Sequence, residues 1–423
     1  MADKCNYRDR SDAYSCARPR AMDEWCVFHF ENNGVRPAPE FQQHLNGLIQ
    51  VKDGDWRGFV FPRELTLRDI SFDFRVDMTR AKVGALNLVG CKFHQEVDLS
   101  EILCAGDFTA NSCNFAKDLN CNKAQFAGEF NWSSIIDGTA RFNGCEFVKS
   151  ARVYGQFNGK AEWSSSRFSD SALFHGGWIA FMNVGTDAAG TIPFVSKPLF
   201  SGETHLDGID FRRAGRTRFE KVDFSKAFVR DTDFRGVTLH DITWATINGR
   251  RAIYDEVWDR ETEARHAPML PKLEAAYRTI RVCIEESKDF NTASDFYFGE
   301  MQARRKQMTP LRRHVVSVEA LYWLLSGYGC RPARAFGVLL LLVGLHALIT
   351  GALLYGAGFH LPDPELTAKA LNRTLILLLP LRGNGGITPL GGWWFLLDFV
   401  FGVCAVIQTA LFVLALRGRI KRG

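Results

Sequence analysis

Apolar side chains recur at every fifth position between residues 217 and 244. The large ones stand at Phe219, Phe224, Val229, Phe234, Leu239 and Trp244. A smaller residue precedes each of them by two positions, at Thr217, Val222, Ala227, Thr232, Val237 and Ile242. Helices repeat their apolar positions at about 3.6 residues and strands at every second residue, so neither explains this interval. A backbone that turns a corner every five residues explains the interval, because it directs one large and one small side chain inward on each face. The segment therefore predicts stacked coils whose inward side chains form a continuous column.

A looser form of this pattern occupies the preceding part of the chain. Its large inward positions are spaced first by eleven and later by four to six residues, at Phe93, Cys104, Phe115 and Phe126 and at Phe142, Phe147, Val153, Phe157, Trp163, Phe168 and Phe174. In these residues the chain resembles the pentapeptide-repeat family, and the resemblance implies that family's fold, a right-handed, four-sided parallel β-helix. The pattern covers roughly residues 70–174 and 200–244, whereas residues 176–198 interrupt it and indicate an insertion.

Two segments near the C-terminus are apolar throughout. They run over residues 335–355 and 393–416, 21 and 24 residues long, and each matches the roughly 20 residues that cross a bilayer as a helix. The alternative, two buried helices of a soluble core, would need a very large apolar shell around them. These segments predict a two-span membrane domain, placed at residues 335–423.

Basic residues beside the two spans predict the orientation. Seven precede the first span, four follow the second and three lie between: Arg304, Arg305, Lys306, Arg312, Arg313, Arg331 and Arg334; Arg417, Arg419, Lys421 and Arg422; Lys369, Arg373 and Arg382. Basic residues favour the cytoplasmic side, so we expect both termini in the cytoplasm and the protein in the inner (cytoplasmic) membrane.

Residues 1–21 contain no apolar stretch of the kind found in a secretory signal, so we expect the N-terminus to remain in the cytosol. We therefore expect reduced cysteines.

The loop between the spans has an apolar segment of its own, residues 366–381. It is too short for a third crossing and predicts a re-entrant or interfacial helix. A two-span channel module has a short helix between its two membrane-spanning helices. Some relatives of this architecture resemble potassium channels in this region. The resemblance stops at the selectivity filter, because Arg382, Gly383, Asn384 and Gly385 stand in its place. These four residues are candidates for the lining of a pore mouth.

The second span has one small and partly polar face. It consists of Asp398, Gly402, Ala405 and Thr409, with Gln408 beside it. Small residues permit close helix contact, and polar residues inside a membrane face protein or water. The face is therefore a candidate for pore lining or for helix packing. His346 in the first span is either a hydrogen-bonded interior residue or a proton sensor.

The region between the β-helix and the membrane has a helical period. Its apolar positions recur by three and four, at Leu273, Tyr277, Ile280 and Ile284, and later at Val315, Val318, Tyr322 and Leu325. The first set predicts a helical hairpin within residues 251–310, with Asn291 as the cap of its second helix. The second set predicts a helix within residues 311–334, either in the cytoplasmic headgroup layer or packed in the ordinary way.

The 11 cysteines fall into two groups. Those on or beside inward positions of the repeat serve as small apolar fillers: Cys104, Cys113, Cys121 and Cys145. The other group belongs to residues 1–35 and has the spacing C-x10-C-x9-C-x2-H: Cys5, Cys16, Cys26 and His29. Three thiolates and an imidazole suit a tetrahedral structural zinc ion, and the last pair resembles half of a zinc knuckle. The alternative is unligated cysteines in a flexible tail.

Charge and motifs exclude several functions. The net charge is +5, and the two repeat blocks, residues 68–177 and 201–244, carry 12 basic against 13 acidic and 8 against 8 residues. A near-neutral surface neither grips nucleic acid nor imitates it. We find no catalytic motif, so we do not expect an enzyme.

Two functions remain for a β-helix of residues 36–250 on a membrane domain. One is a homo-oligomeric, most simply cyclic, pore or channel-like assembly in the lipid bilayer. The other is a membrane-anchored scaffold for protein partners.

Overall fold

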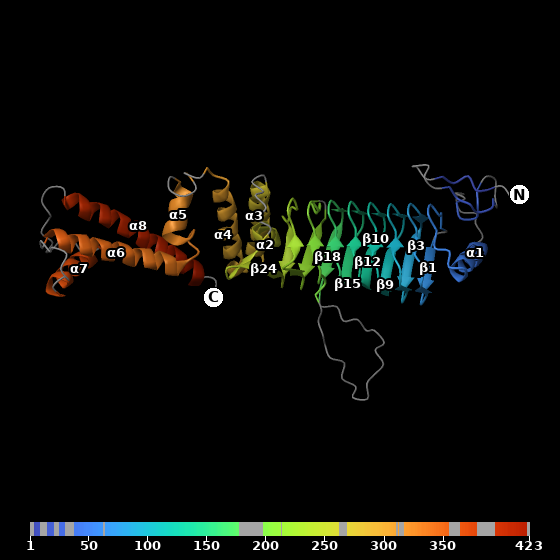
Figure 1. Cartoon of the computed structure of the whole chain (residues 1–423), viewed down its shortest axis with the longest axis horizontal. Helices are drawn as coiled ribbons and strands as arrows, with labels where there is room; N and C mark the ends of the chain where they lie inside the picture. The colour runs from blue at the N-terminus through green and yellow to red at the C-terminus, as the bar shows by residue number, and fades with distance from the viewer. Residues whose placement is uncertain are drawn as a thin grey trace, which may run out of the picture. The chain divides into compact units, whose positions relative to one another are not determined.

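The computed structural model describes residues 4–8, 15–20, 25–29, 38–61, 64–176, 198–212, 214–261, 269–309, 312, 317–354, 364–378 and 394–420 (Figure 1). The chain forms two compact units, Met1–Lys288 and Asp289–Gly423. Most of the predicted insertion at residues 176–198 and all of the pore-mouth candidates, Arg382, Gly383, Asn384 and Gly385, lie outside the described residues.

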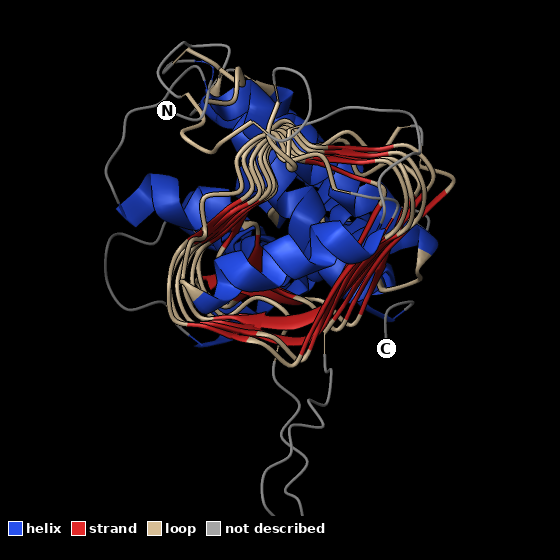
Figure 2. Cartoon of the chain, turned by 90° about the vertical axis from the view of Figure 1, so that its right-hand side faces the viewer, coloured by secondary structure: helices blue, strands red, loops and turns tan. Residues whose placement is uncertain are grey.

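The first unit is a parallel β-solenoid of about 8 turns, with about 21 residues per turn and three parallel sheets. The largest sheet contains β1 (Glu64–Arg68), β5 (Ala85–Val89), β9 (Phe108–Phe115), β12 (Phe130–Ile136), β15 (Ala151–Phe157), β18 (Ser171–His175), β20 (Arg216–Glu220) and β23 (Val237–His240), with β2 (Ser71–Phe72) and β6 (Lys92–Phe93) beside this path. Figure 2 looks along the solenoid, so that successive turns lie behind one another.

Two sheets of very short strands form other sides of the coil. One contains β3 (Val76–Asp77), β7 (Val97–Asp98), β10 (Leu119–Asn120), β13 (Ala140–Arg141), β16 (Ala161–Glu162), β19 (Thr204–His205) and β22 (Ala227–Phe228). The other contains β4 (Lys82–Val83), β8 (Leu103–Cys104), β11 (Gln125–Phe126), β14 (Glu146–Phe147) and β17 (Arg167–Phe168). At the C-terminal end, β21 (Asp223–Phe224), β24 (Thr243–Ile247) and β25 (Arg250–Ala252) form a small sheet in which β24 and β25 are antiparallel.

Columns of aromatic rings fill the solenoid. Phe126, Phe147 and Phe168 occupy one register position in three successive turns, and their rings stack at centroid distances of 5.3 and 4.6 Å. The large residues predicted to point inward between 217 and 244 are all buried, which confirms the five-residue interpretation. Lys226 and Arg235 are exposed, as the same interval requires. The predicted filler cysteines of the repeat are buried as well.

Helices cover both ends of the solenoid, where the last turn has no further turn to bury its core. At the N-terminal end, α1 (Ala38–Gln50) buries Phe41 and Leu45, and Phe41 packs on Phe61 at a centroid distance of 5.5 Å. At the C-terminal end lie α2 (Tyr254–Glu261) and α3 (Leu270–Glu286). The residues predicted for the apolar face of α3 are buried: Leu273, Tyr277, Ile280 and Ile284.

The second unit is helical. It contains α4 (Phe290–Lys306), α5 (Val318–Ser326), α6 (Pro332–Leu354), α7 (Pro364–Leu378) and α8 (Trp394–Ile420). The expected cap at Asn291 is wrong, because α4 begins one residue earlier and the Asp289 side chain accepts a hydrogen bond from the Thr292 amide. A carboxylate three residues before that amide is already in the N-cap position.

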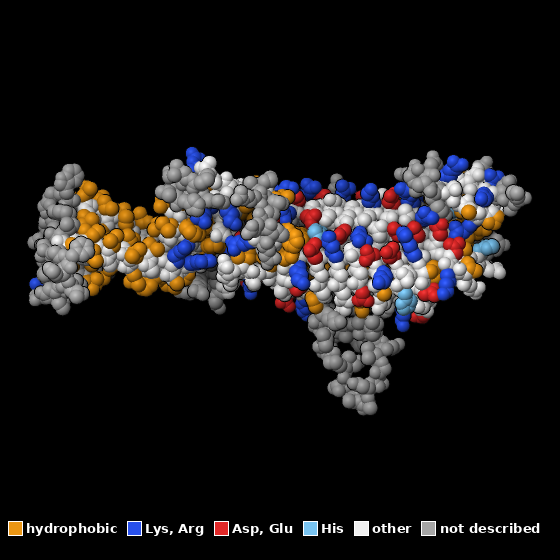
Figure 3. Space-filling model, in the orientation of Figure 1, with side chains coloured by type: hydrophobic (Ala, Val, Ile, Leu, Met, Phe, Trp, Pro, Cys, Tyr) orange, Lys and Arg blue, Asp and Glu red, His pale blue; other side chains and the backbone are white. Residues whose placement is uncertain are grey.

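Helices α6 and α8 are long and apolar enough to cross a membrane, over Pro332–Ala352 and Phe395–Arg417. Only 28% and 22% of their most apolar stretches are buried inside the chain. Most of their apolar surface therefore faces outward, and hydrophobic side chains cover this region in Figure 3. The predicted short segment between the spans forms α7, which at 15 residues is shorter than a bilayer crossing requires.

Candidate metal centre and polar cluster of the helical unit

The four candidate zinc ligands come together through two short backbone pairings. Lys4 pairs with Pro19, and Arg8 with Ser15, in antiparallel bridges. The Cys5 amide donates to the Arg18 carbonyl at 2.9 Å and the Cys16 amide to the Tyr7 carbonyl at 3.0 Å. These bonds place Cys5 and Cys16 on adjacent extended segments. Cys26 and His29 lie on one turn, in which the His29 amide donates to the Cys26 carbonyl at 3.2 Å.

The ligand atoms have the spacing of a tetrahedral metal site. All four residues are buried, and the three sulfurs and the imidazole nitrogen lie within 4.8 Å of one another. The His29 Nδ1 atom is 3.6 Å from Cys5 Sγ and 3.2 Å from Cys26 Sγ, and the Cys16 and Cys26 sulfurs are 4.0 Å apart. In a zinc site with bonds of about 2.3 Å to sulfur, neighbouring sulfurs are about 3.8 Å apart. The cluster could therefore bind a metal such as zinc with small shifts of the ligands.

Neighbouring groups orient the His29 ring. Its Nε2 atom is 2.8 Å from the Arg57 carbonyl oxygen. Because a carbonyl only accepts, Nε2 carries the proton and Nδ1 presents its lone pair to the sulfurs. The Tyr7 ring stacks on the imidazole at 3.9 Å with an interplanar angle of 5°. This is the outer-shell support that metal-binding histidines ordinarily have.

The thiols are also polarised. The hydrogen bond from the Cys26 thiol lowers the pKa of Cys16, and the His29 ring lowers it further, whereas the same bond raises the pKa of Cys26. A cation bound between the two sulfurs would replace the thiol protons, because metals bind the thiolate form.

Arg18 joins the cluster to the first turn of the solenoid. Its guanidinium donates to the Asp53 carboxylate at 2.6 Å and to the Asp55 carbonyl at 2.8 Å. It also lies 4.9 Å from the Phe59 ring centroid, and Phe59 stacks on Phe28 at 4.3 Å. The candidate metal centre is therefore continuous with the aromatic core and belongs to the N-terminal cap.

Gly58 provides the space for Tyr7. A Cβ atom at this glycine would lie 2.0 Å from the Tyr7 ring, and its φ of +67° disfavours any other residue. We expect Gly58→Ala to displace Tyr7 from His29 and to speed zinc transfer to a chelator by about fivefold or more, as a loss of about 1 to 3 kcal/mol would do. A colorimetric chelator assay measures this rate.

Gly249→Ala is the matched control, because Gly249 has a φ of +76° and nothing within 4 Å of its added Cβ. It carries the same backbone strain without the clash. Equal transfer rates in the two variants would contradict the role given to Tyr7.

A second cluster joins the three helices α6, α7 and α8. The Asp398 carboxylate accepts a hydrogen bond from Arg373 at 2.6 Å and lies 3.2 Å from His346 Nε2. On the other side of the ring, His346 Nδ1 is 2.9 Å from the Thr374 hydroxyl. The Phe401 ring stacks on the imidazole at 3.9 Å. Each helix thus contributes at least one polar side chain to a single, largely buried network.

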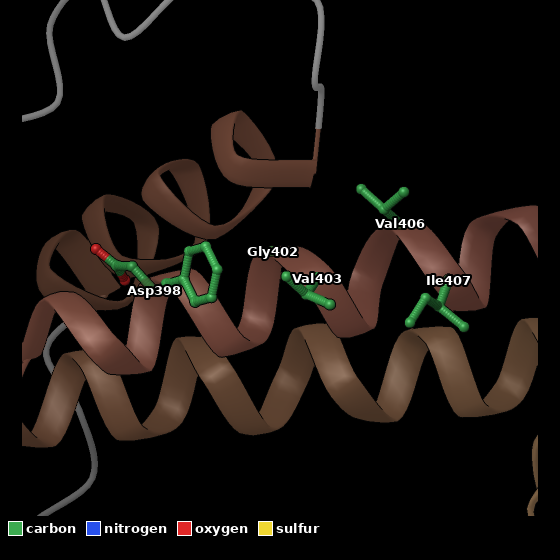
Figure 4. Close-up of a pocket in the computed structure, with 6 residues that line it drawn as sticks. Asp398, Gly402, Val403, Val406 and Ile407 are labelled. Carbon is green, nitrogen blue, oxygen red and sulfur yellow. The ribbon is translucent and has the colours of Figure 1, made fainter.

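The predicted small face of α8 is partly used inside the chain. Ala405 and Gln408 are buried, and the Gln408 amide donates to the carbonyls of Leu325 and Ala335 at 3.0 and 2.7 Å. The Thr409 hydroxyl donates to the Ala405 carbonyl at 2.7 Å. Gly402 and Asp398 border an open groove of about 410 Å³, whose other lining residues are Phe399, Val403, Val406 and Ile407 (Figure 4).

The sequence indicated His346 and Asp398 separately and did not predict that they form one hydrogen-bonded cluster with Arg373 and Thr374. The signal was present, because ionisable residues within apolar segments of a membrane domain usually pair with one another. Three such residues on three successive segments could have been matched on charge alone.

Comparisons with protein-family models, with curated proteins and with solved structures found no match for this chain.

Proposed function

We propose that this protein is a membrane-anchored scaffold, in which α6 and α8 cross the lipid bilayer and the β-solenoid presents a surface to protein partners. The observation that carries the proposal is the distribution of polar groups in α6, α7 and α8. Asp398 accepts a hydrogen bond from Arg373 and lies beside His346, and the Gln408 side chain donates to backbone carbonyls of the same chain. The outward side chains of α8 are apolar over most of its length. Such a surface suits lipid or another apolar helix.

The resemblance to pentapeptide-repeat membrane proteins supports the finer features of the proposal. A five-residue period with a turn of about 21 residues suits a right-handed, four-sided β-helix. The positive flanks of the spans favour cytoplasmic termini. The zinc ion that we assign to Cys5, Cys16, Cys26 and His29 has a structural role, because its four ligands are all protein side chains and leave no open position.

Charge on the solenoid supports protein rather than nucleic-acid partners. Oppositely charged residues pair across successive turns, as between Arg152 and Glu129 or Arg141 and Asp118, each at 2.9 Å. Acidic and basic side chains alternate over the surface (Figure 3). A mixed surface of this kind gives specificity to a protein contact and has no net attraction for a polyanion.

A homo-oligomeric pore or channel is the second candidate. The open groove bordered by Asp398 and Gly402 favours it, since this part of the predicted face borders space that another helix could fill. In a ring of chains, the groove would receive a neighbouring helix or face the axis.

Ion flux separates the two functions. We expect liposomes that contain the wild-type protein to leak ions no faster than protein-free liposomes, and Thr409→Leu to behave in the same way, because the ionisable residues of the helical unit pair with one another and the outward side chains of α8 are mostly apolar. A fluorescent ion-flux assay over a range of voltage and pH measures the leak. Flux in the wild type that Thr409→Leu reduces, with equal protein incorporation, would replace the scaffold with the pore.

A further inference from the structure

Arg305, in the last turn of α4, has a buried guanidinium that forms no ion pair with any residue that the structure describes. The residue is 8% exposed. Within the part of the chain that the structure describes, neither its Nε nor its Nη1 atom has a hydrogen-bond partner. Its guanidinium carbon lies 4.0 Å from the centroid of the Trp323 ring in α5. Buried arginines are almost always paired, because an unpaired charge is expensive to remove from water.

Two more arginines lie close to this guanidinium. Arg334 lies over the same Trp323 ring at 4.6 Å, and Arg331 over the Phe298 ring at 4.8 Å. Arg334 is near enough to Arg305 and Arg331 to be repelled by both. Among the described residues, no carboxylate forms an ion pair with any of the three. Aromatic rings pack against the guanidinium planes. One N–H group of Arg334 donates to the Trp323 carbonyl at 3.1 Å, and the other N–H groups of the three arginines can donate to an anion.

Tyr328 adds an uncharged donor. Its hydroxyl is buried and has no partner within the described chain, and its φ of +59° is a conformation that non-glycine residues adopt at a cost of about 1 kcal/mol or more. Burial raises the pKa of Tyr328 to about 12, so the hydroxyl keeps its proton and can donate. The charges of Arg305 and of the Glu319 carboxylate both act on this hydroxyl, so the hydroxyl lies near the Arg305 guanidinium and near one acidic group.

The surface of α5 indicates where the anion comes from. Val318, Leu321 and Leu324 are exposed at 80%, 52% and 52%, on the same helix as Trp323. An apolar helix face beside a group of arginines matches an amphiphile with an anionic head and hydrocarbon tails. A free anion would gain nothing from the apolar face.

We propose that Arg305, Arg331, Arg334 and Tyr328 form a binding site for the phosphate of an anionic phospholipid headgroup, with α5 lying against the acyl chains. Arg305 is the central ligand, because its fork of N–H groups is already desolvated and stacked. The site rests on the membrane anchoring proposed above. It would fasten the junction between α4 and the first span to the headgroup layer.

Native mass spectrometry of the full chain tests the site. The protein is purified in detergent and titrated with phosphatidylglycerol or with phosphatidylcholine of the same acyl chains. We expect the wild type to bind phosphatidylglycerol about tenfold more tightly, in line with hydrogen bonds between charged groups. We expect Arg305→Gln to abolish this preference.

Arg304→Gln is the matched control, since Arg304 is the preceding residue of the same helix turn and is exposed. It removes an equal charge and should leave the preference within about twofold of the wild type. Equal affinity for the two lipids in the wild type would overturn the proposal, as would an equal loss in Arg304→Gln and Arg305→Gln. If Arg305→Gln fails to fold, Arg305→Lys replaces it in the test, because lysine keeps the positive charge and lacks the planar guanidinium. An unchanged lipid preference in Arg305→Lys would also overturn the site.

Inorganic phosphate, added to lipid-free protein, distinguishes the source of the anion. If phosphate stabilises the wild type against heat as well as phosphatidylglycerol does, with the same dependence on Arg305, the ligand is a free phosphate and the lipid proposal fails. Carbonate extraction of cell membranes tests anchoring separately. Wild-type protein released by carbonate would contradict the scaffold itself, whereas retained protein without headgroup preference would contradict only the lipid site.

Discussion

Replacing Cys16 and Cys26 together with alanine is expected to remove the metal from the protein and to unfold its N-terminal cap. Purified wild-type protein should contain about one zinc per chain, as one tetrahedral site requires. Structural zinc in small domains supplies about 10 kcal/mol or more, so two of its four ligands cannot be lost without losing the ion. Elemental analysis by mass spectrometry measures the metal, and limited proteolysis measures cleavage within residues 1–35.

Cys104→Ala with Cys145→Ala serves as the control for this experiment. Both cysteines are buried inside the solenoid, away from the predicted ligand set, and their thiols donate to backbone carbonyls. This control variant should keep its zinc. Unchanged metal in the Cys16 and Cys26 variant would refute the site.

Truncation of Phe224 to alanine is expected to lower the free energy of unfolding of the solenoid by about 3 to 5 kcal/mol, the usual cost for a buried phenylalanine. The side chain is 1% exposed and packs on Phe219 and Trp244 at centroid distances of 5.3 and 5.4 Å. Its removal leaves a cavity in a column that neighbouring turns hold rigidly. Urea unfolding of the intact protein in detergent, followed by tryptophan fluorescence, measures the loss.

Lys226→Ala, two residues further on and exposed, should change the same free energy by less than about 0.5 kcal/mol. Each turn of a solenoid contacts only its neighbours and can unfold separately from distant turns, so the fluorescence result should be compared with hydrogen exchange of β21 and β24. A negligible loss in Phe224→Ala would mean that this column does not stabilise the coil.

The repeat could be predicted from the sequence because each coil contacts only its neighbours. Burial in a solenoid therefore depends on local period, and a run from Phe219 to Trp244 at intervals of five is sufficient to separate inside from outside. Phe228 shows the limit of this rule. It lies off the period and is buried, because Tyr254 and Trp258 of α2 pack against its ring at 5.0 and 5.6 Å.

The candidate metal ligands were also predictable, because Cys5 to His29 span only 25 residues and the combination of three cysteines and a histidine is typical of a metal site. The groups that orient these four side chains could not be predicted from the sequence. Arg57, Tyr7 and Gly58 have no metal-binding signature, and each acts only through its position once the segment lies on the first turn of the solenoid.

The sequence by itself determined the coil, the two membrane-length helices and the candidate metal ligands, because each follows from local period, length or spacing. Only the tertiary structure decided which polar residues of the helical unit meet. His346, Arg373 and Asp398 lie on three helices, and Arg305 lies on a different helix from Trp323. No local period relates such residues, because their contact depends on how the helices pack, and packing is set by side chains far apart along the chain.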